Sequence, residues 1–237
     1  MSPHRRVGLI ELACCALFAL GLAIGAPDVR AVESADAAAS QSMQQFLARE
    51  SPTPSYRALR RLEAENRGRT AWLEAWTTFT PGEAFEYLIV SEGGSPSIRS
   101  RVLRAVLEGE KEAIDRGETT RSALAASNYR FESDGLDPAG LVRVALVPRR
   151  NEGVLVAGAM FLKPADGELV RLEGRLARNP SFWVKQVDII RSYARIEGAV
   201  LPIALESRAQ LRLLGPATFR MTYEYAEIDG APVGSRQ

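Results

Sequence analysis

About ten candidate strands, separated by short turns, occupy most of this chain and constrain its fold more than any other feature. Three lie in succession near the middle of the first half, at about 56–64, 69–79 and 85–89. Six or seven more follow in a row, at about 127–132, 139–148, 153–163, 168–176, 182–197, 200–214 and 217–228. Short turns between neighbouring strands favour antiparallel pairing. So many strands without an internal boundary predict a sheet that curls or closes.

One long helix is predicted at 97–116, between the two groups of strands. Pro96 suits its first turn and Gly117 suits its end. Its apolar face consists of Ile98, Val102, Leu103, Val106, Leu107 and Ile114. This helix can cover part of a curved sheet, but it is too short to cover all ten strands.

Two of the candidate strands are apolar on both faces. Leu141–Val147 and Val154–Leu162 have apolar side chains at nearly every position, so something packs inside the curve. We therefore expect an α+β fold with a single strongly curved antiparallel sheet. It would be a half-barrel of about ten strands with helices on its concave side.

Residues 1–31 are typical of a secretory signal peptide. Basic residues near the N-terminus precede an apolar run at 13–26, and small residues fit a cleavage site after Ala31. An uncleaved membrane anchor is an alternative, although it would bury Glu11. Lipoprotein attachment at one of the two cysteines is another. Cleavage predicts a periplasmic protein.

The remaining chain is expected to form one domain with two flanking segments. Segment 32–55 contains a short helix at 37–49, whose apolar residues recur at helical spacing and which two prolines end. The curved-sheet domain spans 56–228 and includes the long helix. The tail at 229–237 is expected to fray.

The composition of the exported chain limits its chemistry. Both cysteines and the only histidine lie within 1–31. Without them, a disulfide, a zinc site of the usual nitrogen and sulfur ligands, and a Ser-His or Cys-His pair cannot form. With 30 Lys plus Arg against 29 Asp plus Glu, the chain has no general attraction for nucleic acid. We expect no metal, no cofactor and no enzymatic activity.

A carboxylate pair could still hydrolyse a glycoside, and Glu74, Glu83 and Glu86 lie near aromatic residues. Such spacing occurs on any half-exposed strand, so solvent-facing carboxylates are the preferred interpretation. The loop at 92–97 lacks the ending of a phosphate-binding loop and is interpreted as a turn and helix cap.

Several segments of the second half resemble a known family. They are Val170-Arg171-Leu172-Glu173-Gly174-Arg175, Pro180-Ser181-Phe182-Trp183-Val184, Tyr193 through Pro202, and Leu214-Gly215 with Phe219 to Tyr225. In these and in its order of elements, the chain resembles the periplasmic outer-membrane lipoprotein carrier superfamily and its lipoprotein-sorting-like members. The resemblance implies an unclosed barrel with helices in its mouth. It also implies an apolar cavity for acyl chains and an arginine that holds the closed state, although no residue here is matched to that arginine.

Aromatic and apolar residues on several strands and on the helix are the candidate ligand-binding set. It comprises Trp72, Trp76, Phe85, Tyr87, Val102, Val106, Phe161, Trp183, Phe219, Met221 and Tyr223. Inward-facing, they would line an apolar pocket, whereas plain core packing beneath the helix is the alternative. Phe182 and Trp183 are adjacent and would point to opposite faces. Two groups of arginines could contact acidic lipid head groups, but interleaved glutamates favour ordinary surface pairs. The two groups are Arg57, Arg60, Arg61, Arg67 and Arg69, and on the helix Arg99, Arg101 and Arg104.

The expected function is that of a periplasmic carrier that binds a lipid or a lipoprotein acyl chain in the concave face of the sheet. Its partners would be lipid or acylated protein, with contact to the envelope membrane surface, and the protein would be a monomer. The alternative is a non-catalytic envelope interaction protein of the same fold with a filled core.

Overall fold

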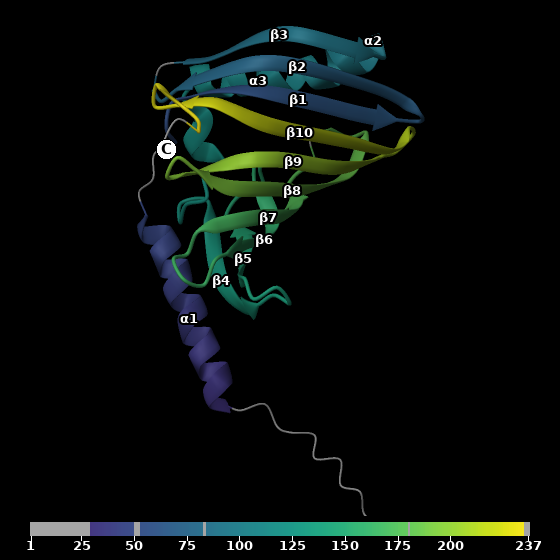
Figure 1. The fold of residues 1–237 in the computed structure, drawn as a ribbon. Coiled ribbons are helices and arrows are strands. Elements are labelled where there is room, and N and C mark those ends of the chain that lie inside the picture. Colours follow the sequence, from purple (N-terminus) through teal and green to yellow (C-terminus); the bar gives the residue numbers. More distant parts are fainter. Residues whose placement is uncertain (1–28, 50–52, 83, 180, 235–237) are drawn as a thin grey trace, which may run out of the picture.

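The computed structural model describes residues 29–49, 53–82, 84–179 and 181–234, so the expected signal peptide lies almost wholly outside the described residues. The strands are β1 (Tyr56–Asn66), β2 (Arg69–Thr80), β3 (Ala84–Gly94), β4 (Tyr129–Leu136), β5 (Val142–Pro148), β6 (Val156–Leu162), β7 (Leu169–Leu176), β8 (Val184–Ile196), β9 (Ala199–Leu211), β10 (Gly215–Ile228) and β11 (Ala231–Pro232). All belong to one antiparallel sheet (Figure 1).

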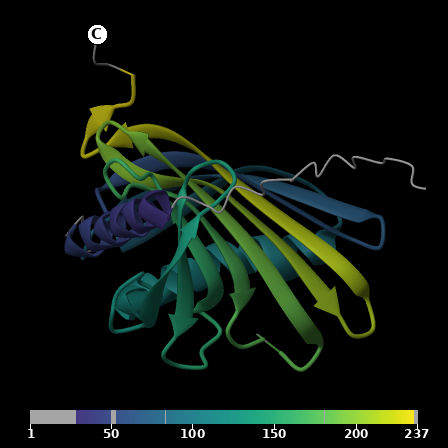
Figure 2. The ribbon, with the colours of Figure 1, turned by 90° about the horizontal axis from the view of Figure 1, so that it is seen from below.

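The strand order is β3-β2-β1-β10-β9-β8-β7-β6-β5-β4, with β11 beside β10. The first meander therefore joins the sheet through its pairing with β10, the last long strand. In the described part of the chain, β3 and β4 remain the two open edges, and the sheet curves without closing (Figure 2). The predicted α+β half-barrel is confirmed. The tail expected to fray instead contributes β11 to the sheet.

Helix α1 (Val29–Ala48) contains most of the helix expected at 37–49 and begins earlier. The helix expected at 97–116 is divided into α2 (Pro96–Ile98), a π-helical turn η1 (Arg99–Leu103) and α3 (Arg104–Asp115). A short 3-10 turn, η2 (Glu118–Arg121), follows. Figure 2 shows α1 and α3 on the hollow side of the sheet, as expected. No helix among the described residues is long and apolar enough to cross a membrane.

Each helix packs on a different end of the sheet. On α3, Leu107 packs with inward residues of β1, β2, β3 and β10, among them Leu62 and Phe85. On α1, Ala39 packs with inward residues of β5 and β6, among them Val144 and Met160. Between these two clusters lie β8, which has no fully buried residue, and β9, which has one. The middle of the concave face is thus the least filled part of the fold.

Candidate functional site

A groove of about 870 Å³ lies over this middle region. One wall is formed by α2, η1 and the start of α3, and the floor by the inward faces of β8, β9, β10 and β1. Its lining residues are Ala64, Glu65, Asn66, Arg67, Arg69, Ser97, Ile98, Arg101, Val102, Val106, Val187, Ile189, Leu205, Ser207, Ala209, Leu211, Leu214, Ala217, Thr218 and Phe219. Most of these side chains are apolar, as in typical small-molecule sites.

Small side chains on the floor create the groove. Val187, Ala209 and Ala217 lie side by side in register across β8, β9 and β10. The next inward row is formed by Ile189, Ser207 and Phe219 in the same three strands. Inward positions of a strand normally carry large side chains that fill a core. Alanine or serine at three of these six positions leaves that volume open.

The wall opposite this floor is the interrupted helix. Ile98, Val102 and Val106 line the groove from this side. The side chain of Val102 remains exposed because it faces the open groove, whereas Leu103 next to it is fully buried against the sheet. The π-helical turn lies at this point, and such turns often occur at functional sites.

Arginines surround one end of the groove. Arg67, Arg69 and Arg101 are exposed there together with Glu65. Among the described residues, no ion pair involves Arg69 or Arg101. Free cations at the mouth of an apolar groove favour ligands or surfaces that carry negative charge.

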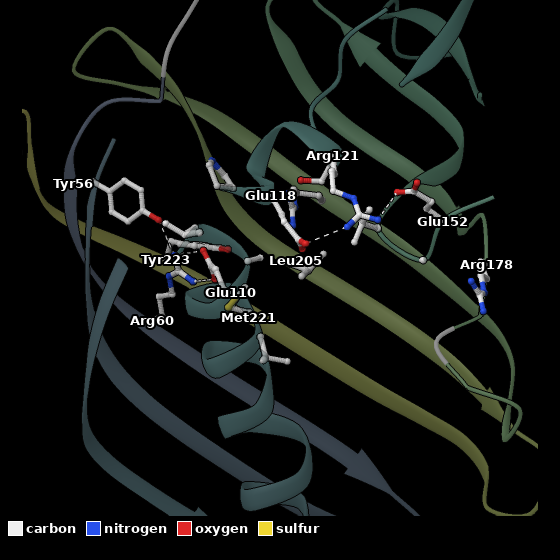
Figure 3. Close-up of a pocket in the computed structure, with 18 residues that line it drawn as sticks. Tyr56, Arg60, Glu110, Glu118, Arg121, Glu152, Arg178, Leu205, Met221 and Tyr223 are labelled. Carbon is white, nitrogen blue, oxygen red and sulfur yellow. Dashed lines mark hydrogen bonds and ion pairs between the residues drawn. The ribbon is translucent and has the colours of Figure 1, made fainter. Parts of the chain in front are cut away.

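A second cavity, of about 510 Å³, adjoins the groove and is more polar (Figure 3). Val106 and Leu205 line both cavities, so the two are contiguous beneath α3. Figure 3 shows Tyr56, Arg60, Glu110 and Tyr223 converging at one end of the cavity. At the other end Arg121 bridges Glu118 and Glu152, with both N–O distances at 3.2 Å.

The buried guanidinium of Arg60 is the centre of the first cluster. It donates to Glu110 at 2.6 and 3.1 Å and to the hydroxyl of Tyr56 at 2.7 Å. It also lies 4.9 Å from the ring centre of Phe85 and 4.7 Å from that of Tyr223. Burial alone would disfavour its charge, but Tyr223 and Glu110 outweigh this and raise the pKa of Arg60. The ordinary surface pair expected for Arg60 is therefore wrong.

Burial keeps the neighbouring phenols protonated. It raises the pKa of Tyr56 to about 12, and it raises the pKa of Tyr223 and Tyr225 as well. Two kinds of contact explain why Arg60 tolerates burial. Aromatic rings cover the faces of its guanidinium, and the carboxylate of Glu110 on α3 binds the edge. The cluster thus fastens the lid helix to β1.

The structure brings five of the predicted ligand-binding residues to the two cavities. Val102, Val106 and Phe219 line the groove, and Val106, Met221 and Tyr223 line the second cavity. Two more predicted residues, Phe85 and Tyr87, lie in the core beneath α3. The hydroxyl of Tyr87 donates to Glu108 of that helix at 2.6 Å, which adds a second link between lid and sheet.

The other four predicted residues do not reach the cavities. Trp72 and Trp76 lie on the convex face, beneath the guanidinium groups of Arg61 and Arg57. Phe161 faces the same side. Each follows from strand alternation, because the buried neighbours on these strands already point inward.

Phe161 pairs across the strands with Arg143 and Arg171 on that outer face. The ring of Phe161 is covered by Arg171 at 4.1 Å. Trp183 immediately precedes β8 in the chain, is 57% exposed and contacts the ring of Phe182. Trp72, Trp76 and the buried Phe161 thus lie on the convex face and Trp183 is exposed, so none of the four lines the two cavities.

The carboxylates considered for hydrolysis are scattered. Glu74 lies on the convex face and accepts hydrogen bonds from Ser91 and Arg61, which lower its pKa. A general acid needs the opposite shift. Glu86 is exposed on β3, and Glu83 lies outside the described residues. No group of His, Cys, Asp or Glu in the described part of the chain could hold a metal ion.

Sequence reasoning missed Arg191, which lines the second cavity. On β8 it shares the inward face with Val187, Ile189 and Tyr193. A charged residue at an inward position among apolar ones was the available signal. The same signal was available for Arg60, between Ala58 and Leu62 on β1.

Together the fold and the groove define a half-barrel with a helix-covered apolar cavity. No protein-family model and no curated protein matches the chain. A DUF1329 family protein from Desulfovibrio piger is similar in structure, with a TM-score of 0.40 and 10% identity over 81% of this chain and 91% of that one.

Two further solved structures are similar at the same level. A LolA superfamily protein from Nitrosomonas europaea has a TM-score of 0.37 and 9% identity over 78% of this chain and 91% of its own. An outer membrane lipoprotein-sorting protein domain from Vibrio parahaemolyticus has a TM-score of 0.38 and 10% identity over 87% and 94%. Their names belong to the superfamily that the sequence resembles. At these identities the matches assign no ligand or activity to this chain.

Proposed function

We propose that this protein binds the apolar chain of a lipid, or of a lipoprotein, in the concave groove and acts as a carrier in the periplasm. The groove itself carries the proposal, because small floor residues leave about 870 Å³ open between the sheet and an apolar helix wall. This volume lies in the range of about 300–1,000 Å³ that ligand sites occupy. Each buried methylene contributes about 0.8 kcal/mol to binding.

The location in the periplasm is supported by the sequence of residues 1–31, which is typical of an export signal. A lipid that crosses an aqueous compartment must have its chains shielded from water. A non-catalytic role is supported by the groove lining, where apolar side chains outnumber groups able to transfer protons.

The first experiment asks what the protein carries. The full chain is expressed with its export signal, purified from the periplasm without detergent, extracted with organic solvent and examined by mass spectrometry. We expect a lipid or an acylated peptide at a stoichiometry near one per protein. Purification without any such molecule counts against the proposal.

The second experiment blocks the groove. Ala209→Trp places an indole on the groove floor, while Gln210→Trp places the same indole on the convex face of the same strand. The uncharged dye N-phenyl-1-naphthylamine, which fluoresces in apolar surroundings, reports occupancy. We expect the first variant to lose dye binding and the second to keep it. Equal binding by both variants contradicts a ligand in this groove.

A contact role in the envelope is the second candidate, and one observation favours it. Phe182, Trp183, Leu213 and Leu214 are exposed by 74%, 57%, 67% and 46% on the loops before β8 and β10. Arg212 links these loops, donating to the carbonyl of Phe182 at 2.7 Å. Such a cluster is typical of contact with a membrane or a partner protein. The open groove argues against the filled core of this alternative.

A further inference from the structure

One charged side chain on the concave face lacks a counter-ion. Among the described residues, no ion pair involves Arg191, although its side chain lines the second cavity. The phenol of Tyr193, two positions along the same face of β8, interacts with this guanidinium. Burial raises the pKa of Tyr223, the next phenol near it, so that this phenol is neutral at pH 7. The carboxylate of Glu110 also favours the charge of this guanidinium, but it is already paired with Arg60.

Among the described residues, the other charges of this cavity are paired, except that of Arg178. Arg60 binds Glu110, and Arg121 bridges Glu118 and Glu152. Arg178 also lines the cavity, and it is exposed to solvent. A guanidinium that is partly removed from water without a counter-ion destabilises the protein, and a bound anion would remove that cost. Two arginines of the cavity lining therefore have no ion-pair partner among the described residues, Arg191 on the sheet and Arg178 at the rim.

The position of Arg191 relates it directly to the groove. It lies in register with Leu205 of β9, which in turn lies in register with Met221 of β10. The adjacent inward row is that of Ile189, Ser207 and Phe219, on the groove floor. Inward residues two apart on a strand are separated by about 7 Å. The positive charge of Arg191 thus lies one row from Ile189 and beside Leu205, which lines both cavities.

We propose that the ligand is an anionic amphiphile whose chain lies along the groove and whose acidic head group binds the guanidinium of Arg191. The inference rests on the proposed function and narrows it. A planar guanidinium can bind a carboxylate or a phosphate with two hydrogen bonds. An acyl chain esterified at its only acid group has no charge to place there. A free fatty acid or another amphiphile with an acid beside its chain does.

The test compares two ligands that differ only in their head group. Decanoate and decanol displace N-phenyl-1-naphthylamine from the purified, delipidated full chain at low ionic strength. We expect the wild-type protein to bind decanoate at least about tenfold more tightly than decanol, because a charge-assisted hydrogen-bonded pair contributes at least one factor of ten in affinity. Arg191→Met should bind the two equally while keeping its affinity for decanol. Arg191→Lys should retain part of the preference.

Arg208→Met is the matched control, because Arg208 lies on the outer face of the neighbouring strand β9 and is exposed. It should behave as the wild type. Equal affinity of the wild type for the two ligands overturns the inference and leaves the proposed function intact. So does a preference that survives in Arg191→Met but disappears in a double variant of Arg69 and Arg101 at the groove mouth. Failure of both ligands to displace the dye overturns the proposed function itself.

A measurement on the unchanged protein covers the case in which Arg191→Met does not fold. Decanoate labelled at its carboxyl carbon is bound to the wild type, and NMR contacts between that carbon and arginine side chains are recorded. Contact with the guanidinium of Arg191 supports the inference. Contact only with Arg69 or Arg101 overturns it.

Discussion

Arg60 of β1 and Glu110 of α3 form a two-point ion pair, with Nη1–Oε2 at 2.6 Å and Nη2–Oε1 at 3.1 Å. The two residues are fifty positions apart in the chain and belong to the sheet and to its lid. The Arg60 side chain is 1% exposed and that of Glu110 is 32% exposed. The pair therefore holds α3 to β1 at the second cavity. The end of the groove beside Arg69 and Arg101 stays open.

Removal of Glu110 should destabilise the protein more than removal of an exposed carboxylate on the same helix. Glu110→Ala leaves the buried guanidinium of Arg60 unpaired, and we expect the free energy of unfolding to fall by about 3 kcal/mol. Glu112→Ala breaks the exposed pair with Arg116 and should cost less than about 1 kcal/mol. Urea denaturation measures both. Equal losses would contradict a buried role for Arg60.

The double variant Arg60→Met with Glu110→Met separates the charge from its packing. Apolar side chains of similar length keep the volume and leave no unpaired charge, so most of the stability should return. A double variant as unstable as Glu110→Ala would mean that the contacts of Arg60 with Phe85 and Tyr223 matter more than its charge.

Alkaline pH should weaken the fold through Tyr56. Burial raises its pKa from 10.0 to about 12, so the unfolded chain loses this proton first. The stabilisation is fully present below pH 10.0 and is lost as the pH rises through about 12. Urea denaturation at successive pH values should show this fall. Tyr56→Phe should flatten part of it, and an unchanged slope in that variant would assign the fall to other phenols.

Acid pH should act through Glu168 near the other end of the sheet. Burial opposes its charge, but Lys163 at 2.7 Å and Arg195 at 2.6 Å outweigh burial and lower its pKa from 4.5. Its stabilisation is present above pH 4.5 and is lost as the pH falls through the lowered pKa. Glu168→Gln should therefore flatten the acid side of the stability profile. Glu227→Gln, at an exposed pair, is the control and should leave the profile unchanged.

Two glycine substitutions should change the free energy of unfolding in opposite directions. Gly158 of β6 faces Gly174 of β7, and a Cβ on Gly158 would clash with the carbonyl oxygen of Glu173. Gly158→Ala should lower the free energy of unfolding by about 2 kcal/mol, because the strands must separate. Gly109 of α3 has no heavy atom within 4 Å of such a Cβ. Gly109→Ala should raise it by about 1 kcal/mol. Thermal unfolding of the two variants decides, and a stable Gly158→Ala would contradict the close strand approach.

The order of elements could be predicted from the sequence because its signals are local. Turn residues indicated each strand from β1 to β10, together with period-two alternation or, for β5 and β6, a continuous apolar run. Of these strands, β3 extends furthest beyond the expected bounds. The apolar stripe at 97–116 indicated the lid helix, although its π-helical turn carried no recognisable signal. A curved sheet followed from strand number alone.

The composition of the site was less predictable. Alternation shows that Trp72 and Trp76 share a face, but it does not say which face the helices cover. Their neighbours Leu73 and Ala75 point inward, so the two indoles point outward. Aromatic size suggested a pocket, whereas the groove depends on small residues such as Ala209.

The sequence by itself determined a curved antiparallel sheet with one long lid, because turns and periodicity are written in neighbouring residues. Only the tertiary structure decided that Arg60 meets Glu110, and that Arg191 lies one row beyond the groove floor. Those relationships depend on the register of strands and on a helix that packs across them. Register is set by contacts between residues far apart in the chain, which no local pattern contains.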